Sequence, residues 1–545
     1  MFCFLGILSV SKSQDPVKNA LSIALMPDEK WWAGIINKGD SMPFGKNLFS
    51  FDFYGNDDGN QATPLLISDK GRFIWSEFPF RFSFREDSII IDHSSGEVLI
   101  NQNGNTLRSA YLDASGKFFP PSGLMPDSLL FSAPQYNLWI ELMYNPNQKD
   151  VLNFASHVIS NGFPPGVMMI DDNWSNYYGS FDFNKSRFPD AKKLIDDLHK
   201  MGFKVMVWVC PFISPDSEAF RELNSRKLLL MDNEGKTETS WDNLSKPMII
   251  EWWNGFSACL DLTNPETKDW LSKKLDFLMK EYGVDGFKLD AGDAHFYANP
   301  DLVSYKKVIP NGHTFLWANI GLDYKFNEYR AMWKMGGEPL VQRLRDKNHS
   351  WEDLRKLIPH ILVSGLSGYA FTCPDLIGGG EINSFLGSME NLDQEMIVRS
   401  AQCHAFMPMM QFSVAPWRVL DSVHLSAVKK AVELRMDFVP EIMKLAVEAT
   451  QTGEPIVRHL EYVFPGQGFS DIDDQFMLGD SIMVAPMLEK GTLRSVRLPE
   501  LKRGKWRADN GIIYRGGQIV KIEVPLDRLP YFTIYRRGYL KSQQV

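Results

Sequence analysis

Cysteine and histidine are scarce in this 545-residue sequence, and their distribution excludes several classes of protein. The five cysteines show no CxxC pair and no His/Cys zinc spacing, so neither a disulfide framework nor a structural zinc site is expected. The ten histidines do not cluster, which argues against a metal hydrolase. Lys and Arg are dispersed and the formal net charge is −9, so nucleic acid is not an expected partner.

Apolar runs of membrane length are also missing, and no stable membrane span is expected. The short run Phe2–Val10 could be the core of a truncated signal peptide, although it lacks a basic leader. Weak support for a secretory or extracytoplasmic location comes from four N-x-S sequons, at Asn173, Asn184, Asn243 and Asn348. The sequence gives no indication of the oligomeric state.

Aromatic residues, in contrast, are abundant at 13%, with 15 Trp. Aromatic faces suit sugar rings, because the axial C–H groups of a sugar stack on them, although large cores also use aromatics heavily. The chain is too long for a single hydrophobic core, so two to four domains are expected.

The two ends of the chain have the pattern of antiparallel sheets. Short alternating runs separated by turn residues predict a β-sandwich over residues 1–130, with strands such as Leu48–Tyr54 and Phe73–Phe84. A second β-sandwich is predicted over residues 441–545, with strands such as Leu493–Leu498 and Tyr531–Arg536. No Gly/Ser linker separates these parts, so the domains are expected to pack tightly.

The middle of the chain, residues 131–440, alternates apolar runs with amphipathic helices. The helices are predicted at Asp190–Met201, Thr267–Tyr282 and Trp351–Val363. Eight apolar runs serve as predicted strands: Leu138–Met143, Val167–Ile170, Lys204–Val209, Gly286–Leu289, Thr314–Ile320, Leu340–Leu344, Tyr369–Thr372 and Met407–Phe412. This alternation predicts an α/β fold with a (β/α)8 TIM barrel. A doubly wound sheet is the alternative, but it would need a Gly-rich phosphate loop that is absent.

Working residues of such barrels lie at the carboxyl ends of the strands, and carboxylates follow four of the predicted strands. They are Asp171 and Asp172, then Asp290 and Asp293, then Asp346, and finally Asp375, which precedes Gly378–Gly380. Each has an ordinary explanation, since a lone Asp after a strand usually caps a helix, Lys288 beside Asp290 could form a structural ion pair, and three glycines could form only a turn. Their convergence on one rim instead indicates an acidic pocket.

Two carboxylates facing each other suit the cleavage of a glycosidic bond. One attacks the anomeric carbon, and the other protonates the leaving oxygen and later activates water. Neither role needs a metal, so no metal site and no cofactor are expected. A nearby cation such as Lys288 would keep the nucleophile ionised, whereas the acid must stay protonated, so the two environments should differ.

These motifs resemble glycoside hydrolase family 31 over nearly the whole chain. The family has an N-terminal β-sandwich, a (β/α)8 barrel and C-terminal β-domains, and it cleaves α-glycosides with retention. The stretch Lys288–Asp293 resembles the nucleophile motif, and residues 181–190 (FDFNKSRFPD) resemble a stretch that ends in Arg-Phe-Pro-Asp. Residues 474–480 and Val484–Pro486 are similar to the family's first C-terminal domain.

The resemblance implies a role for each of these residues. Asp290 is the implied nucleophile, and Asp346, placed at the family's spacing from Arg330, is the implied acid/base. Asp171 or Asp172 matches a sugar-binding acidic position, and Asp375 matches the Asp of an Asp-Ile-Gly-Gly motif. The full set of candidate substrate-binding residues is Asp171, Asp172, Trp174, Trp208, Lys288, Asp293, Trp317, Arg330, Arg343 and Asp375.

Departures from the family's α-glucosidases bear on the substrate. Residues 410–413 read Met-Gln-Phe-Ser where those enzymes carry Arg-Asn-His, and Arg343 and Arg345 stand near the acid/base where Gly is common. The pattern is more similar to the α-galactosidase branch, so an exo-acting enzyme on a terminal α-linked galactose is favoured.

Several alternatives stay open beside this reading. They are an α-glucosidase, an α-xylosidase, transglycosylation or lyase chemistry on the same intermediate, and a catalytically silent barrel that only binds carbohydrate. A silent relative would tolerate Asn or Ser at either catalytic position, whereas this chain has both Asp290 and Asp346.

Overall fold

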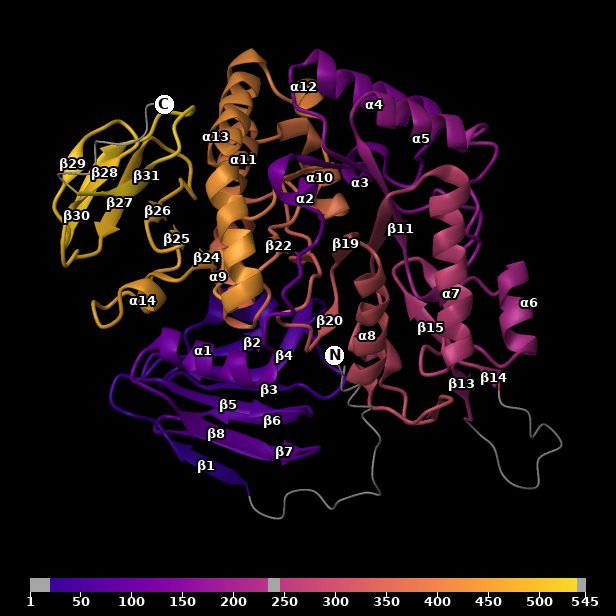
Figure 1. The fold of residues 1–545 in the computed structure, drawn as a ribbon, viewed down its shortest axis with the longest axis horizontal. Coiled ribbons are helices and arrows are strands. Elements are labelled where there is room, and N and C mark those ends of the chain that lie inside the picture. Colours follow the sequence, from indigo (N-terminus) through magenta and orange to yellow (C-terminus); the bar gives the residue numbers. More distant parts are fainter. Residues whose placement is uncertain (1–19, 234–245, 537–545) are drawn as a thin grey trace.

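The computed structural model describes residues 20–233 and 246–536 of the chain. The run Phe2–Val10 and the sequon at Asn243 therefore lie outside the described residues. An N-terminal sheet domain is followed by a barrel, a long helix and a C-terminal sheet domain (Figure 1). Within the described residues, none of the helices has the length and apolar character needed to cross a membrane.

Two antiparallel sheets build the N-terminal sheet domain, with the strand orders β1-β7-β6-β3 and β2-β4-β5-β8. The strands are β1 Leu21–Ala24, β2 Trp31–Ile35, β3 Phe49–Asp52, β4 Gln61–Ser68, β5 Arg72–Ser76, β6 Phe80–Phe84, β7 Ser88–Ser94 and β8 Val98–Gln102. The predicted run Phe73–Phe84 is thus two strands, separated by a bend at residues 77–79. A 3₁₀ turn, η1 Ile36–Ser41, and the helix α1 Leu107–Phe118 complete this domain.

Eight parallel strands form the predicted barrel, in the order β22-β21-β19-β17-β11-β10-β9-β23. They are β9 Gln135–Asn137, β10 Val167–Ile170, β11 Lys204–Val209, β17 Gly286–Leu289, β19 Phe326–Tyr329, β21 Gln342–Arg343, β22 Thr372–Cys373 and β23 Gln411–Phe412. The two ends of the sheet meet where Leu376, just after β22, bridges Gln411 in parallel. The barrel is therefore nearly closed, and the carboxyl ends of its strands share one rim.

Three barrel helices agree with the predicted amphipathic segments: α5 Ala191–Lys200, α7 Pro265–Phe277 and α9 Trp351–Leu366. Further helices around the barrel are α4 Gln148–Ser160, α8 Pro310–Ile320 and α11 Gln394–Ala405. Asp190 caps α5, because its carboxylate accepts a hydrogen bond from the backbone N–H of Lys193. The last predicted turn after α7 is a π-helix, η2 Leu278–Tyr282.

Two of the eight predicted strands are wrong. Thr314–Ile320 belongs to α8, whose apolar residues are buried on several sides, and periodicity cannot separate such a helix from a buried strand. The fifth barrel strand is β19, which carries the buried polar residues Asn327 and Glu328 and so lacks an apolar signal. Leu138–Met143 likewise contains a short helix, α3 Trp139–Leu142, and the first strand, β9, precedes it.

The C-terminal sheet domain follows the long helix α13, Ser422–Thr452. Its sheet has the order β24-β25-β26-β31-β28-β29, and a separate pair joins β27 to β30. These strands are β24 Val457–Arg458, β25 Phe476–Leu478, β26 Ile482–Val484, β27 Leu493–Leu498, β28 Lys505–Ala508, β29 Ile513–Tyr514, β30 Gln518–Glu523 and β31 Tyr531–Tyr535. The expected limit at residue 440 falls within α13, and the three-domain division remains our proposal.

Candidate active site

A cavity of about 760 Å³ opens at the rim formed by the carboxyl ends of the barrel strands. Residues that follow β10, β17, β19 and β21 line it, and so do residues of the N-terminal sheet domain. Asp290 and Asp346, the two carboxylates expected to carry the chemistry, both line this one cavity.

Asp290 directly follows β17, and its own backbone N–H still donates to the carbonyl of Val209 on the neighbouring strand. Three donors hold its carboxylate. Trp208 Nε1 donates to Oδ2 at 3.0 Å, while Arg330 Nε and the backbone N–H of Ala291 donate to Oδ1 at 2.9 and 2.8 Å. The side chain is 12% exposed, so one carboxylate is fixed in orientation and still reaches the cavity.

The charges around Asp290 keep it ionised. Burial alone would raise the pKa of Asp290, but the positive charges of Arg330, Lys288 and Arg343 outweigh burial and hold it well below its usual range. This is the electrostatic environment that a nucleophile requires, and Lys288 contributes to it as the sequence predicts.

Asp346 is bound differently. It lies in the loop after β21, where the buried Arg343 donates to both Asp346 and Asp375. Its side chain is 33% exposed, against 0% for Asp375. Asp375 also accepts hydrogen bonds from the backbone N–H groups of Lys347 and Gly380, at 2.7 and 3.2 Å. Burial and the charge of Asp346 raise the pKa of Asp375 to about 7.

Two adjacent carboxylates follow β10 on another side of the cavity. Asp171 forms a buried ion pair with Lys288 at 2.6 Å. Asp172 accepts hydrogen bonds from Asn254 at 2.6 Å and from the hydroxyl of Tyr178 at 3.2 Å, and its Oδ1 has no partner among the described residues. Burial and the charge of Asp171 raise the pKa of Asp172 to about 7. Asp172 therefore lies at the cavity with one of its carboxylate oxygens without a partner among the described residues.

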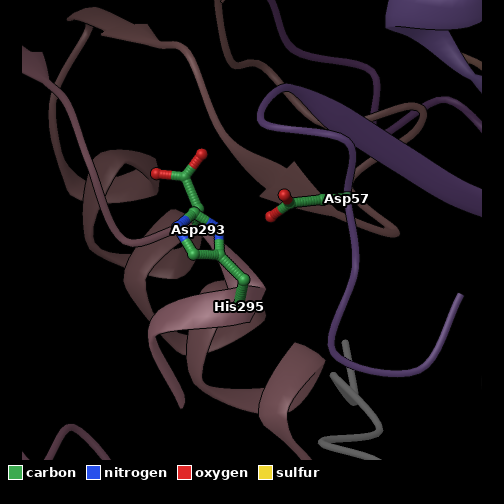
Figure 2. A group of neighbouring side chains, drawn as sticks. All are labelled: Asp57, Asp293 and His295. Carbon is green, nitrogen blue, oxygen red and sulfur yellow. The ribbon is translucent and has the colours of Figure 1, made fainter. Parts of the chain in front are cut away.

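Asp293 completes the acidic rim. Both of its oxygens accept from the guanidinium of Arg330, at 2.7 and 2.6 Å, so Arg330 joins Asp290 to Asp293. Behind them, Asp57 on the loop between β3 and β4 points toward Asp293 and His295 (Figure 2).

The three side chains of Figure 2 each offer an atom within 4.8 Å of the others, a spacing that could hold a cation. All four carboxylate oxygens already accept N–H donors, however. Arg330 occupies both oxygens of Asp293, and the backbone N–H groups of Gly59 and Ala294 donate to Asp57 at 3.0 and 2.8 Å. The adjacent guanidinium also repels a cation, so we infer a hydrogen-bonded cluster rather than a metal site.

The structure places nine of the twelve predicted side chains at the cavity and three behind it. Trp174 donates through Nε1 to the carbonyl of Trp208 at 2.7 Å and so supports a cavity residue. Trp317 is fully buried on α8, with its ring against Gly292. Asp375 is fully buried behind Asp346. These three residues therefore do not line the cavity.

Aromatic residues that sequence reasoning missed also line the cavity: Trp139, Tyr144, Trp253 and Phe296. Trp253 is half exposed at the tip of the hairpin formed by β15 Ile249–Trp252 and β16 Gly255–Cys259, and its ring lies 5.2 Å from the Arg330 guanidinium. Asn254 and Gly255 form the Asn-Gly pair typical of hairpin turns, so this hairpin carried a readable signal.

The N-terminal sheet domain contributes a further part of the wall through Asn37, Lys38, Asp40, Ser41 and Gly59. Asp40 reaches across the domain boundary to the buried His360 on α9, at 3.0 Å. No local pattern in the sequence marks these residues, because their role depends on how two domains dock.

Comparison with known proteins agrees with this architecture. A family model described as the glycosyl hydrolases family 31 TIM-barrel domain matches residues 129–445, and one described as the family's C-terminal domain matches residues 453–539. The myogenesis-regulating glycosidase of Mus musculus is 32% identical over 446 residues, which are 79% of this chain and 60% of that protein. Alpha-glucosidase 2 of Bacillus thermoamyloliquefaciens is 27% identical over 71% of this chain and 50% of that protein.

The chain thus spans about 60% or less of the length of these two relatives. Among solved structures, a dextranase of Flavobacterium johnsoniae, complexed with glucose, superposes with a TM-score of 0.80 at 20% identity. The superposition covers 96% of this chain and 68% of that one and shows a shared fold. The barrel match extends over more than half of the sequence, and this chain therefore belongs to glycosyl hydrolase family 31.

Proposed function

We propose that this protein is a retaining α-glycosidase that removes a terminal α-linked sugar, with galactose the favoured one. The observation that supports this most directly is the pairing of Asp290 and Asp346 on one cavity, each held by a different arginine. Asp290 is the more buried of the two and is kept ionised, whereas Asp346 is the more exposed.

In the first step, the Asp290 carboxylate attacks the anomeric carbon while the bond to the leaving oxygen breaks. Asp346 gives its proton to that oxygen, which leaves as an alcohol. In the second step, water attacks the anomeric carbon of the covalent intermediate, Asp346 takes a proton from the water, and Asp290 is released as a carboxylate. Two inversions give net retention.

The preference for galactose rests on the residues around the sugar site. At residues 410–413, where the family's α-glucosidases carry Arg-Asn-His, Gln411 donates to Glu328 at 2.6 Å inside the barrel and Ser413 accepts from the backbone N–H of Ile140. These side chains are occupied within the wall. Lys288 lines the cavity and uses one of its three N–H donors on Asp171, so it is a candidate donor for an axial hydroxyl.

A panel of nitrophenyl α-glycosides of galactose, glucose, xylose and N-acetylgalactosamine would test this function. We expect release from the galactoside, reduced by at least about 10⁴-fold in Asp290→Asn and unchanged in Asp216→Asn, an exposed aspartate away from the cavity. If the enzyme prefers another sugar, the assignment of galactose is wrong and that sugar replaces it. Inactivity of the wild type on the whole panel and on unsubstituted disaccharides would favour the silent barrel.

The role of Asp346 is tested with Asp346→Asn and two leaving groups. An activated leaving group needs no proton, so the variant should lose much less activity on a dinitrophenyl glycoside than on a disaccharide. Equal loss on both substrates would remove Asp346 from the role of general acid.

A further inference from the structure

One short segment of the N-terminal sheet domain touches both arginines that hold the proposed catalytic pair. Asn60 ends the loop between β3 and β4, and Gln61 is the first residue of β4. Both side chains are completely buried. A short strand, β20 Met332–Trp333, runs parallel to β4 with Met332 opposite Gln61, which fixes this segment beside the end of β19.

The two side-chain amides converge on two backbone carbonyls of the barrel. Gln61 Nε2 donates to the carbonyl oxygens of Arg330 and Arg343, at 2.6 and 2.8 Å. Asn60 Nδ2 donates to the same two oxygens, at 2.9 and 3.1 Å. Two NH₂ groups supply four hydrogens and the two carbonyl oxygens supply four lone pairs, so both carbonyls can be satisfied by these amides. Gln61 Nε2 also lies 3.4 Å from the carbonyl oxygen of Tyr329, and the two side-chain amide oxygens have no hydrogen-bond partner among the described residues.

These carbonyls lie one residue beyond the ladder that joins β19 to β21. The ladder between β19 and β21 consists of the pair Tyr329 and Gln342, and Arg330 and Arg343 each come one residue later. A buried carbonyl without a donor would cost free energy comparable to a lost hydrogen bond. The amides of Asn60 and Gln61 therefore replace the missing ladder and join the two strand ends.

The side chains of the same arginines face the proposed chemistry. Arg330 donates to Asp290 and Asp293, and its Nη1 also donates to the carbonyl of Gly59 at 2.7 Å. Arg343 donates to Asp346. The segment Gly59–Gln61 thus fixes the backbone of both arginines and the guanidinium of one of them.

We propose that Asn60 and Gln61 are positioning residues, which set the separation of the two catalytic carboxylates by tying together the backbones of Arg330 and Arg343. The N-terminal sheet domain is then a working part of the catalytic centre. This inference rests on the function proposed above for Asp290 and Asp346.

The matched test compares Gln61→Met with Thr63→Val in the full-length protein. Met keeps the length of the side chain and removes both donors. Thr63 lies on the same strand, and its hydroxyl donates to Tyr369 across the same domain boundary at 3.1 Å, but it bonds to neither arginine. Asn60→Ala serves as a second variant should Gln61→Met fold poorly.

We expect Gln61→Met to lower kcat at least tenfold while KM changes little, because the sugar-binding carboxylates of β10 are untouched. The acidic limb of kcat/KM should move to higher pH, because a displaced Arg330 no longer holds Asp290 as strongly ionised. The charged and titratable groups facing Asp290 and Arg330 are Lys288, Arg343, Asp293, Asp346, Asp57 and His295. Thr63→Val should leave both kcat and the acidic limb of the kcat/KM profile unchanged.

A purely structural role gives a different result. If Gln61→Met and Thr63→Val lower Tm alike and leave kcat and the pH profile of the folded enzyme unchanged, the proposal is overturned.

Failure of the proposed function would be recognised separately. In that case the wild type itself would be inactive on every glycoside, and the crystal structure of Gln61→Met would still decide the positioning role. Displacement of Arg330 from Asp290 would support it, and an unmoved guanidinium would reject it.

Discussion

At the scale of single residues, the buried carboxylates of the site fall into two electrostatic groups. Arg330, Lys288 and Arg343 outweigh burial at Asp290 and lower its pKa. Burial dominates at Asp172 and Asp375, whose pKa values rise to about 7. Neighbouring carboxylates therefore differ in protonation near neutral pH, because burial dominates at two of them and nearby positive charges dominate at the third.

The raised pKa of Asp172 predicts that this residue lowers the stability of the fold at high pH although it serves sugar binding. The pKa of the Asp172 carboxyl is near its ordinary 3.8 in the unfolded chain and about 7 in the folded protein, so the folded state holds an extra proton between these two pH values. The free energy of unfolding should therefore fall as pH rises through this window. Asp172→Asn removes this pH dependence. The Tm of the variant minus the Tm of the wild type should therefore be larger at pH 8 than at pH 5. The same substitution should weaken sugar binding.

Thermal melts at both pH values, together with KM, would check this prediction. Asp216→Asn, at an exposed position, is the control and should show no such pH dependence. A Tm difference that is the same at pH 5 and pH 8 would show that Asp172 does not titrate in this range.

At the scale of elements, the turn after β22 shapes the acid side of the cavity. A Cβ atom at Gly380 would lie 2.7 Å from Oδ1 of Asp375 and 2.9 Å from Oδ1 of Asp346, both closer than real Cβ contacts allow. Glycine at this position therefore permits both carboxylates to share Arg343.

Gly380→Ala should reduce kcat/KM by about 10- to 100-fold, because a displaced acid is no longer aligned with the leaving group. Gly387→Ala is a matched control in α10, Ile382–Ser388, where a Cβ meets nothing within 4 Å and alanine favours the helix. We expect the control to keep full activity. Steady-state kinetics on the two variants decide the matter, and equal activities would contradict the steric argument.

The sequence predicted elements well wherever one physical signal dominated. Amphipathic periodicity gave α5, α7 and α9 close to their observed bounds, and continuous apolar runs gave β10, β11 and β17. It failed at β19, whose buried Asn327 and Glu328 are paired inside the barrel, because hydropathy carries no record of such partners. Trp317 was misplaced for the same reason, since its apolar run is a buried helix.

The candidate site was predictable to the extent that it lies along single strands. Nine predicted side chains line the cavity because strand ends and their following residues are local features. The wall formed by Asn37–Ser41 and the roles of Asn60 and Gln61 depend on contacts between distant parts of the chain, which no local pattern encodes.

At the scale of the whole molecule, the buried apolar residues form one large core and several smaller ones. The large core is continuous from the N-terminal sheet domain through the barrel and reaches one side of β25 and β26, whereas Trp506 and its neighbours form a separate core in the rest of the C-terminal sheet domain. Arg399 on α11 links the two, because its guanidinium donates to the carbonyls of Gly491 and Val524.

This division predicts two unfolding transitions. Trp506→Ala should cost about 3–5 kcal/mol within the C-terminal core and give a separate transition at lower temperature. Trp75→Ala, an equally buried residue of the N-terminal sheet domain, should instead lower the main transition, and thermal loss of activity should follow it. Differential scanning calorimetry of both variants, with activity measured across the same temperatures, tests this. A single transition lowered alike by both would refute the division.

The side-chain amides of Asn60 and Gln61 also limit how domains of such proteins can be exchanged. A chimera that joins this barrel to a foreign N-terminal sheet domain would keep Asp290 and Asp346, the proposed nucleophile and acid. The two carboxylates would still lose their relative placement unless the foreign domain carried two adjacent carboxamide side chains at the start of the corresponding strand. A residue inserted directly after Gln61 would turn its amide away from the barrel, because successive side chains of a strand alternate between the two faces of its sheet. Exchange of the N-terminal sheet domain would therefore alter the active site, even when every residue of the barrel is kept.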